Sequence, residues 1–284
     1  MRRARLVAFP PDMARLSRAA LLLLLALPAR AVQREQSLDI GGRRRWWTVH
    51  EPAVRASTGP LPAVLVLHGG GGNPKNAERM SGMSALADRE GFLAVYPAGT
   101  GRFKRRLLTW NSGNCCGYAM EQGVDDTAFL AALIERLVKE GRADPKRVYM
   151  TGMSNGAMMT QRFACERADL VSAIAPVAGQ LNIGACAPAR PVAVLMIHGL
   201  KDEHAPYGGG EGKRMIKARA DRSVPDSAAM WERAGSSVTV VAHPGGHIWP
   251  GGKPGLRMGN ADPVLAEPKA TELMWRFFKD RARR

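Results

Sequence analysis

A serine stands between two glycines at residues 152–156, in the order Gly-Met-Ser-Asn-Gly. A strand-like segment ending at Thr151 precedes it, and a helix-like segment beginning at Ala157 follows it. Glycines permit a tight turn between a strand and a helix, and such a turn lifts the serine hydroxyl clear of the sheet. The N-terminus of the following helix favours the negative charge that develops on a carbonyl oxygen under attack. The pattern predicts that Ser154 is a nucleophile for acyl transfer.

A second glycine-rich segment follows an earlier apolar run. It reads His-Gly-Gly-Gly-Gly-Asn over residues 68–73, and glycines there let backbone N–H groups approach a substrate carbonyl. A plain glycine-rich turn or a phosphate cradle is the alternative, but the Gly-Lys-Ser/Thr of a phosphate-binding loop is absent. The segment favours an oxyanion loop that serves Ser154.

A serine needs a base, and the base needs an orienting group. Downstream of Ser154 the chain offers Asp202 after the apolar segment 192–197, and then His247 in a Gly/Pro-rich loop after the segment 238–242. The order Ser, acid, His is that of the α/β-hydrolases. We therefore expect a triad of Ser154, Asp202 and His247.

Other residues compete for the roles of acid and base. Glu203 adjoins Asp202, while His204 lies in the loop of the acid and His243 ends a strand-like segment. Asp125 and Asp126 precede Ser154 and fit the N-terminal positions of a helix, where we expect a structural role. None of these residues is placed as well as the expected triad.

Apolar segments alternate with helix-period segments along the chain. The strand-like segments are residues 63–67, 92–96, 148–150, 171–177, 192–197 and 238–242, and helical spacing is seen at 129–138 and 274–278. Continuous apolar strands between helices predict an α/β fold whose mostly parallel central sheet carries helices on both faces. Residues 46–50 are expected to form an antiparallel edge strand. Ligands should then bind at the carboxyl ends of the strands.

The chain of 284 residues carries a formal net charge of +16, which by itself suggests a binder of anionic polymers or nucleic acid. Residues 1–31 contribute six arginines and one aspartate to this net charge. Their basic flank, short apolar run and Ala-Arg-Ala ending predict a signal peptide. We expect a single catalytic domain over residues 32–284, secreted to the periplasm or outside the cell, with no membrane anchor. A non-catalytic basic secreted binding protein is the alternative from another class, but the basic runs are scattered and no nucleic-acid motif is matched.

Four cysteines, Cys115, Cys116, Cys165 and Cys186, are an even number, which favours disulfides in an exported chain. A bond between neighbours would close a strained small ring. We therefore expect one bridge from each of Cys115 and Cys116 to Cys165 and Cys186, with the pairing open. One bridge plus two buried thiols is the alternative, and no histidine lies at a spacing typical of zinc sites.

Seven separated motifs, in order, resemble the esterase family of poly(3-hydroxybutyrate) depolymerases and feruloyl or acetylxylan esterases. They lie at residues 68–76, 109–117, 124–129, 147–159, 173–179, 197–207 and 245–252. The resemblance implies an α/β-hydrolase fold in which Ser154 is the nucleophile, Asp202 the acid and His247 the base. It also implies that the amides of Gly70 and Asn155 are the oxyanion donors, with Trp110, Tyr207 and Trp249 as substrate-pocket walls.

The activity that this resemblance implies is ester hydrolysis through an acyl-enzyme, with no metal or organic cofactor. The expected partner is a small-molecule or oligomeric ester, with no nucleic acid involved. Polyhydroxyalkanoate (3-hydroxybutyrate) oligomers are the expected substrates, and feruloyl or acetyl esters of plant polysaccharides are the alternative. Relatives usually have Thr or Ser where Leu200 precedes the acid, and usually carry a longer stretch before the histidine loop, so the choice of ester stays open.

Overall fold

The computed structural model describes residues 32–53, 59–214, 219–254 and 262–283. The expected signal peptide at residues 1–31 lies outside the described residues. Within the described part of the chain, no helix is long and apolar enough to cross a membrane.

A sheet of eight strands runs through the molecule in the order β1-β2-β4-β3-β5-β6-β7-β10. Its strands are β1 (Val32–Ile40), β2 (Arg43–Glu51), β3 (Leu61–Leu67), β4 (Leu93–Pro97), β5 (Ala143–Met153), β6 (Ala173–Val177), β7 (Ala193–Gly199) and β10 (Val238–His243). In this spatial order, every pair of neighbouring strands from β4 through β10 is parallel. The carboxyl ends of these six strands therefore lie along one edge of the sheet. The expected α/β class with a mostly parallel sheet is confirmed.

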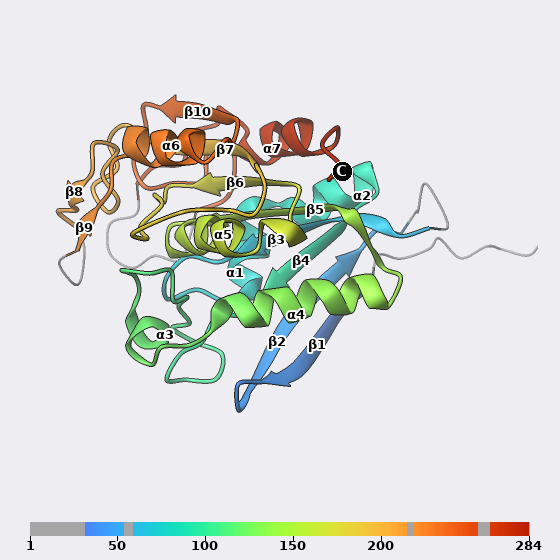
Figure 1. The fold of residues 1–284 in the computed structure, drawn as a ribbon. Helices are drawn as coiled ribbons and strands as arrows, with labels where there is room; N and C mark the ends of the chain where they lie inside the picture. Colours follow the sequence, from blue (N-terminus) through green and yellow to red (C-terminus); the bar gives the residue numbers. More distant parts are fainter. Residues whose placement is uncertain (1–31, 54–58, 215–218, 255–261, 284) are drawn as a thin grey trace, which may run out of the picture.

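The helices cover both faces of this sheet (Figure 1). They are α1 (Pro74–Ser81), α2 (Met83–Glu90), α3 (Gly117–Glu121), α4 (Asp126–Lys139), α5 (Asn155–Glu166), α6 (Val224–Arg233) and α7 (Ala270–Phe278). A short 3₁₀ turn η1 (Ala168–Leu170) and a small hairpin of β8 (Gly210–Glu211) and β9 (Ala220–Asp221) complete the regular structure. The helices expected around residues 129–138 and 274–278 are thus α4 and α7.

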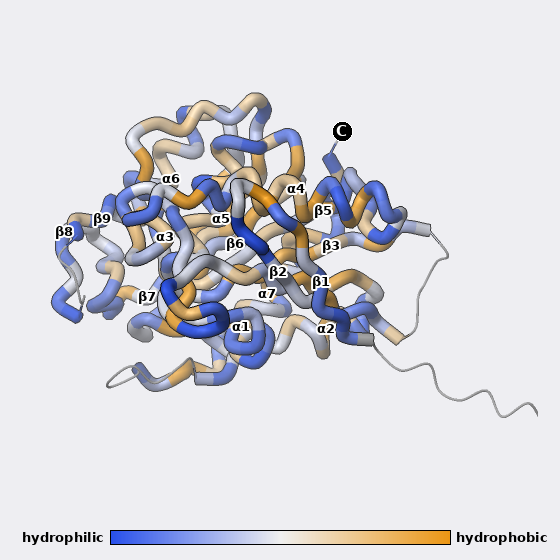
Figure 2. The backbone as a smooth tube through the Cα atoms, turned by 90° about the horizontal axis from the view of Figure 1, so that it is seen from below, coloured by the Kyte–Doolittle hydropathy of each residue, from blue (hydrophilic) through white to orange (hydrophobic). Residues whose placement is uncertain are grey.

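Strand β3 shows how the two faces are packed. Its seven residues are all buried, with Leu65 and Leu67 in the core beneath α4, α5 and α6, and Val64 and Val66 in the core beneath α1, α2 and α7. Successive side chains of a strand point to opposite faces, so a strand that is buried on both sides must be apolar throughout. In Figure 2 the backbone of α1, at the surface, is coloured as largely hydrophilic.

The expectation that residues 46–50 form an antiparallel strand is confirmed, but the expected edge position is wrong. They belong to β2, which pairs antiparallel with β4 on one side and with β1 on the other. Gly41 and Gly42, with φ of 56° and 68°, form the tight turn that joins β1 to β2. Strand β1 is the exposed edge of the sheet, so its sequence is polar and contains no apolar run. The search for apolar runs in the sequence therefore missed this strand.

Asp125 and Asp126 begin helix α4, as expected. The Asp125 side chain caps the helix by accepting a hydrogen bond of 2.8 Å from the Ala128 N–H. Asp126 is buried and forms an ion pair of 2.7 Å with buried Arg45 of β2, while its second oxygen accepts the Asn111 N–H. The carboxylate thereby joins β2, α4 and the segment that follows β4.

This buried pair allows a test of stability. Replacing Asp126 with Ala leaves the Arg45 charge buried without its partner, and we expect a loss of about 3–5 kcal/mol in the free energy of unfolding. Asp125→Ala removes only a helix cap and should cost about 1 kcal/mol. Urea unfolding followed by circular dichroism measures both, and equal losses for the two variants would contradict the role given to the Arg45 pair.

Candidate active site

Ser154 occupies a sharp turn between β5 and α5. Its φ of 56° and ψ of −122° are unusual for a residue with a side chain. Its N–H donates to the Val177 carbonyl oxygen at 2.9 Å, and its own carbonyl oxygen accepts the Met158 N–H at 3.0 Å. The side chain is half-buried at the carboxyl edge of the sheet. This is the strand–turn–helix geometry expected of a nucleophile elbow.

Gly152 and Gly156, on either side of the turn, are required because the backbone of β3 packs against them too closely for a side chain to fit. A Cβ at Gly156 would lie 2.5 Å from the carbonyl oxygens of Leu67 and His68, and a Cβ at Gly152 would lie 2.9 Å from the Leu67 oxygen. Real Cβ atoms do not approach backbone so closely, so any larger residue would force β3 and the helix apart. The two glycines therefore let the serine turn pack directly against the end of β3.

The glycine-rich loop after β3 lies beside the serine. A Cβ at Gly69 would be 3.6 Å from the Ser154 Cβ, and a Cβ at Gly70 would be 3.7 Å from the Asn155 Cβ. The N–H groups of Gly71 and Gly72 donate to Leu108 and Gly69, whereas the Gly70 N–H donates to no residue in the described part of the chain.

The second candidate donor is the backbone N–H of Asn155. Asn155 is the first residue of α5, so its N–H has no acceptor within the helix. Two backbone donors without acceptors thus lie close to Ser154, as an oxyanion hole requires.

His68 holds the glycine-rich loop at residues 68–73 in place, a role that the motif did not reveal. Its Nε2 accepts the Gly99 N–H at 3.0 Å, so the ring proton is on Nδ1, which donates to the Gly69 carbonyl oxygen at 2.8 Å. Burial lowers the pKa of His68 to about 4, and the nearby Arg45 charge acts in the same direction. The ring is neutral at ordinary pH, and its two hydrogen bonds hold the loop in a fixed conformation.

The Asn155 side chain is a second support. Its Oδ1 accepts the Trp110 N–H at 2.8 Å and its Nδ2 donates to the Trp110 carbonyl oxygen at 2.9 Å, which fixes the segment after β4 against α5. Nδ2 also lies 3.2 Å from the Ser112 hydroxyl oxygen. The amide is buried and fully engaged, which leaves the backbone N–H as the only part of Asn155 that can serve a substrate.

Asp202 and His247 meet at the carboxyl ends of β7 and β10. The His247 Nδ1 lies 2.7 Å from the Asp202 Oδ2, and the carboxylate is completely buried. The other oxygen, Oδ1, accepts the backbone N–H groups of His204 and Ala205, each at 2.8 Å. Hydrogen bonds at both oxygens fix the carboxylate, so it can hold the imidazole in one orientation.

The charge state of Asp202 follows from this environment. Burial alone would raise the pKa of the carboxyl, but the positive charge that His247 can carry and hydrogen bonds from His198 and His247 outweigh it and lower the pKa below its usual range. Asp202 is therefore a carboxylate at neutral pH. Buried His198, which sequence reasoning passed over, contributes through an Nε2 that lies 3.3 Å from the Asp202 Oδ2.

The competing residues occupy other positions. His204 packs its ring against His247, with centroids 4.8 Å apart, but its Nδ1 has no partner in the described part of the chain. His243 is buried and its Nδ1 accepts the Gly245 N–H. Of the three histidines considered for the role of base, His204, His243 and His247, only His247 has a ring nitrogen hydrogen-bonded to a carboxylate in the described part of the chain.

A residue that no motif indicated, Asp262, holds the loop of His247. Its Oδ2 accepts the His247 N–H at 2.7 Å, and its Oδ1 pairs with Arg214 at 2.7 Å. The Ser154 hydroxyl itself makes no hydrogen bond with a described residue. Loose contacts between nucleophile and base are common in enzymes without substrate.

The three aromatic residues expected as pocket walls differ in exposure. Trp110 and Trp249 are 0% and 1% exposed, and their indole N–H groups donate to the His68 carbonyl oxygen and the Thr271 hydroxyl. Such buried rings do not reach a substrate, so we revise their expected role to support from behind the loops. Tyr207 is partly exposed, lies edge-on to His198 at 6.1 Å, and stays a prediction as a wall.

Asp202, His204 and His247 also offer ligand atoms within 4.8 Å of one another, which would suit a metal ion. Both oxygens of Asp202 already accept hydrogen bonds, and the His247 Nδ1 is committed to one of them. This arrangement suits the orientation of a base better than the ligation of a cation.

The cysteines pair differently from what the sequence suggested. Cys115 is bonded to Cys116, and Cys165 to Cys186, so the expected cross-bridges are wrong. The Cys115 sulfur contacts Asn155 at the start of α5. Cys165 lies ten residues further along the same helix, a separation of about 15 Å at 1.5 Å per residue. That distance excludes a bond between Cys115 and Cys165.

Comparison with known proteins agrees with this geometry. A family model described as "Esterase PHB depolymerase" matches residues 49–205. NocK of Nocardia uniformis subsp. tsuyamanensis, described as an esterase, is 28% identical over 267 residues, covering 79% of this chain and 76% of the relative. The bifunctional acetylxylan esterase/xylanase XynS20E of Neocallimastix patriciarum is 34% identical over 165 residues, which cover 58% of this chain but only 22% of that larger protein.

Solved structures share the fold at low identity. A dienelactone-hydrolase-like phosphotriesterase from metagenomic libraries gives a TM-score of 0.62 at 16% identity, covering 89% of this chain and 99% of that one. A ferulic acid esterase gives 0.52 at 15% identity, covering 78% and 93%. The family match spans more than half of the sequence, and the chain therefore belongs to the esterase PHB depolymerase family of carboxylic ester hydrolases.

Proposed function

We propose that this protein is a secreted serine esterase that hydrolyses 3-hydroxybutyrate oligomers or related esters through an acyl-enzyme on Ser154. The observation that carries the proposal is the hydrogen bond from His247 to the buried Asp202 carboxylate, on strands that end at the same edge as the Ser154 turn. The signal-like residues 1–31 support secretion, and residues 32–284 then form the catalytic domain.

The mechanism follows from the positions of the groups. His247 Nε2 takes the proton of the Ser154 hydroxyl as its oxygen attacks the ester carbonyl, and Asp202 stabilises the imidazolium. The Gly70 and Asn155 N–H groups stabilise the oxyanion of the tetrahedral intermediate. The alcohol leaves with the proton from His247, and a water molecule then releases the acid from Ser154 by the same steps in reverse.

Replacing Ser154 with Ala tests the nucleophile. Hydrolysis of a short-chain aryl ester should fall by about 10⁶-fold, since no covalent intermediate can form, and labelling by a fluorophosphonate should disappear. The spectrophotometric assay and in-gel fluorescence measure the two effects. Ser84→Ala, at a serine that lies on α2 rather than on the elbow, serves as the control and should retain both. Labelling of the Ser154→Ala variant would refute the assignment.

The dependence of activity on pH tests the base and its carboxylate. Because the pKa of Asp202 is lowered below its usual range, this group stays ionised in mildly acidic solution and continues to orient His247 there. We expect no acid limb of kcat/KM in the range where a free aspartate titrates, and a limb in that range would contradict the ionised state of Asp202. Asp202→Asn keeps the shape of the side chain but should lower kcat by about 10⁴-fold, with KM little changed.

Feruloyl or acetyl esters of polysaccharides are the second candidate substrates. The match to a relative described as an acetylxylan esterase/xylanase, and to a "Feruloyl esterase B" of Piromyces equi at 37% identity over 106 residues, favours them. A panel of methyl ferulate, acetylated xylan and 3-hydroxybutyrate oligomers, compared by kcat/KM, decides between the candidates. We expect the 3-hydroxybutyrate oligomers to exceed the other two by at least tenfold, and the reverse order would transfer the assignment to polysaccharide esters.

A further inference from the structure

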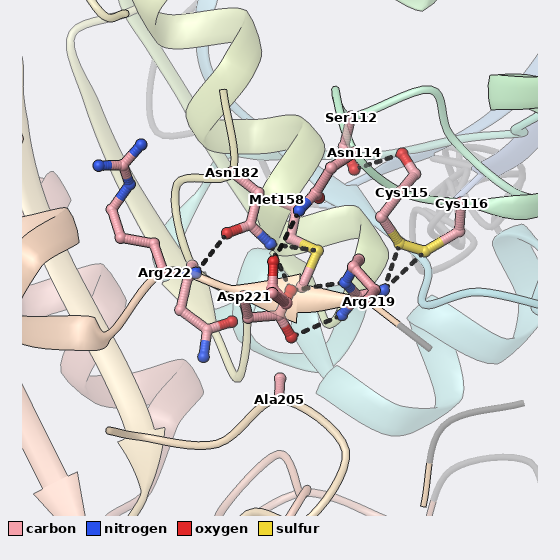
Figure 3. A network of polar contacts seen from close by, with 12 residues as sticks. Ser112, Asn114, Cys115, Cys116, Met158, Asn182, Ala205, Arg219, Asp221 and Arg222 are labelled. Carbon is pink, nitrogen blue, oxygen red and sulfur yellow. Dashed lines mark hydrogen bonds and ion pairs between the residues drawn. A yellow bond between two sulfur atoms is a disulfide. The ribbon is translucent and has the colours of Figure 1, made fainter. Parts of the chain in front are cut away.

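The Cys115–Cys116 disulfide lies against an arginine from a distant part of the chain. The Nη1 of Arg219 is 2.9 Å from the Cys115 sulfur and 3.3 Å from the Cys116 sulfur (Figure 3). Cys115 is 1% exposed and Cys116 is half-buried. The guanidinium thus covers the disulfide from the side of the β8–β9 hairpin.

Arg219 is itself firmly held. Its Nε and Nη2 donate to the two oxygens of Asp221 at 2.5 and 2.8 Å, which is the paired geometry that makes such ion pairs strong. Asp221 is 5% exposed and also accepts the Asn182 Nδ2–H at 2.6 Å. The third nitrogen of the guanidinium, Nη1, therefore points at the sulfur atoms from a fixed position.

The disulfide in turn contacts the candidate oxyanion donor. The Cys115 sulfur lies 3.6 Å from the Asn155 Nδ2. The Cys115 carbonyl oxygen accepts the Ser112 N–H and hydroxyl, and the Ser112 hydroxyl oxygen accepts a hydrogen bond from the same Asn155 amide. Cys116 donates its N–H to the Trp110 carbonyl oxygen, which also accepts from Asn155. Directly or through Ser112 and Trp110, these contacts lead to the side chain of Asn155, whose backbone N–H is the candidate oxyanion donor.

We propose that the Cys115–Cys116 disulfide, braced by Arg219, positions Asn155 for oxyanion stabilisation, and that its reduction by a dithiol lowers turnover. The inference deepens the proposed function and rests on it. Cys115, Cys116 and Arg219 act here as positioning residues, since they reach the reacting atoms only through Asn155. The Cys165–Cys186 disulfide, at the far end of α5, has no such connection.

The reduction is a thiol–disulfide exchange. A thiolate of dithiothreitol attacks one sulfur of the pair, the other sulfur leaves and takes up a proton, and the second thiol of the reagent closes its own ring to release the protein dithiol. One disulfide of the protein is reduced to two thiols while one dithiol is oxidised. Because Cys116 is partly exposed while Cys115 is buried, we expect the thiolate to attack the sulfur of Cys116.

Steady-state kinetics before and after reduction test the proposal. Losing one oxyanion donor costs about 10²–10³-fold in kcat, and a displaced donor should cost about tenfold, with KM for a short aryl ester changing less than twofold. The Cys165→Ala/Cys186→Ala variant is the matched control and should keep this response. Cys115→Ala/Cys116→Ala should show the lower kcat from the start and no further response. An unchanged kcat in protein whose mass shows the Cys115–Cys116 pair to be reduced would overturn the proposal.

Variants of Arg219 test the contact between its guanidinium and the Cys115–Cys116 disulfide separately. Arg219→Met should lower kcat as reduction does, while Arg219→Lys, which keeps a donor near the sulfur atoms, should recover part of it. Arg190→Met removes an arginine that donates to the carbonyls of Ala168 and Val171 and serves as the control. If Arg219→Met and Arg190→Met have the same small effect on kcat, the brace is refuted.

Hydrogen–deuterium exchange distinguishes this inference from the proposed function. On reduction, the amides of residues 110–116 and of the first turn of α5 should exchange at least several-fold faster, whether or not the protein hydrolyses the chosen ester. Absence of esterase activity in the oxidised protein would count against the proposed function. Unchanged exchange in these segments would count against the brace.

Discussion

The close approach of α5 to the end of β3 is the constraint on which the site depends. Gly156 lies so near the Leu67 and His68 carbonyl oxygens that a Cβ could not fit between them. This contact sets the Ser154 hydroxyl and the Asn155 N–H beside the Gly69–Gly70 loop with no side chain between them. If β3 and α5 were one side chain further apart, the serine turn would still form, but the two candidate oxyanion donors would no longer converge.

A layer of buried polar groups keeps this arrangement rigid. His68 holds the Gly69 carbonyl oxygen and the Gly99 N–H, Asn155 holds both backbone groups of Trp110, and Asp202 accepts hydrogen bonds at both oxygens. Each of these groups would be costly to bury alone. Because almost all of their hydrogen bonds are made within the protein, the polar layer fixes the loops instead of loosening the core.

The sequence predicts a triad because each of its members follows a strand that is visible as an apolar run. Ser154, Asp202 and His247 come after the runs at 148–150, 192–197 and 238–242, and the carboxyl ends of parallel strands share one edge. The contact of Asp202 with His247 agrees with that prediction. The α/β class was predictable for the same reason, whereas polar β1 was missed because an exposed edge strand has no apolar pattern.

Features that depend on distance between remote segments could not be predicted. The length of α5 separates Cys115 from Cys165 and so excludes a bond between them, and no spacing in the sequence conveys this. Trp110 and Trp249 stand in motifs beside the site, but whether an indole faces a substrate or the core depends on packing from both sides. Asp262 lies outside every motif, and only the folded chain shows that it holds the His247 N–H.

The folded structure shows where part of the excess of arginine residues is used. Several arginines are partners of buried carboxylates rather than parts of a basic surface: Arg45 with Asp126 and Arg219 with Asp221 are the clearest pairs. Arg142, with its side chain only 14% exposed, likewise pairs with Glu51. Arginine suits these positions because its planar guanidinium can satisfy several acceptors at once and stays charged when buried. Part of the basic composition therefore serves to join strands and loops. Each such pair also occupies one carboxylate, so the formal net charge is unchanged, but fewer arginines are free on the surface than the sequence count suggests.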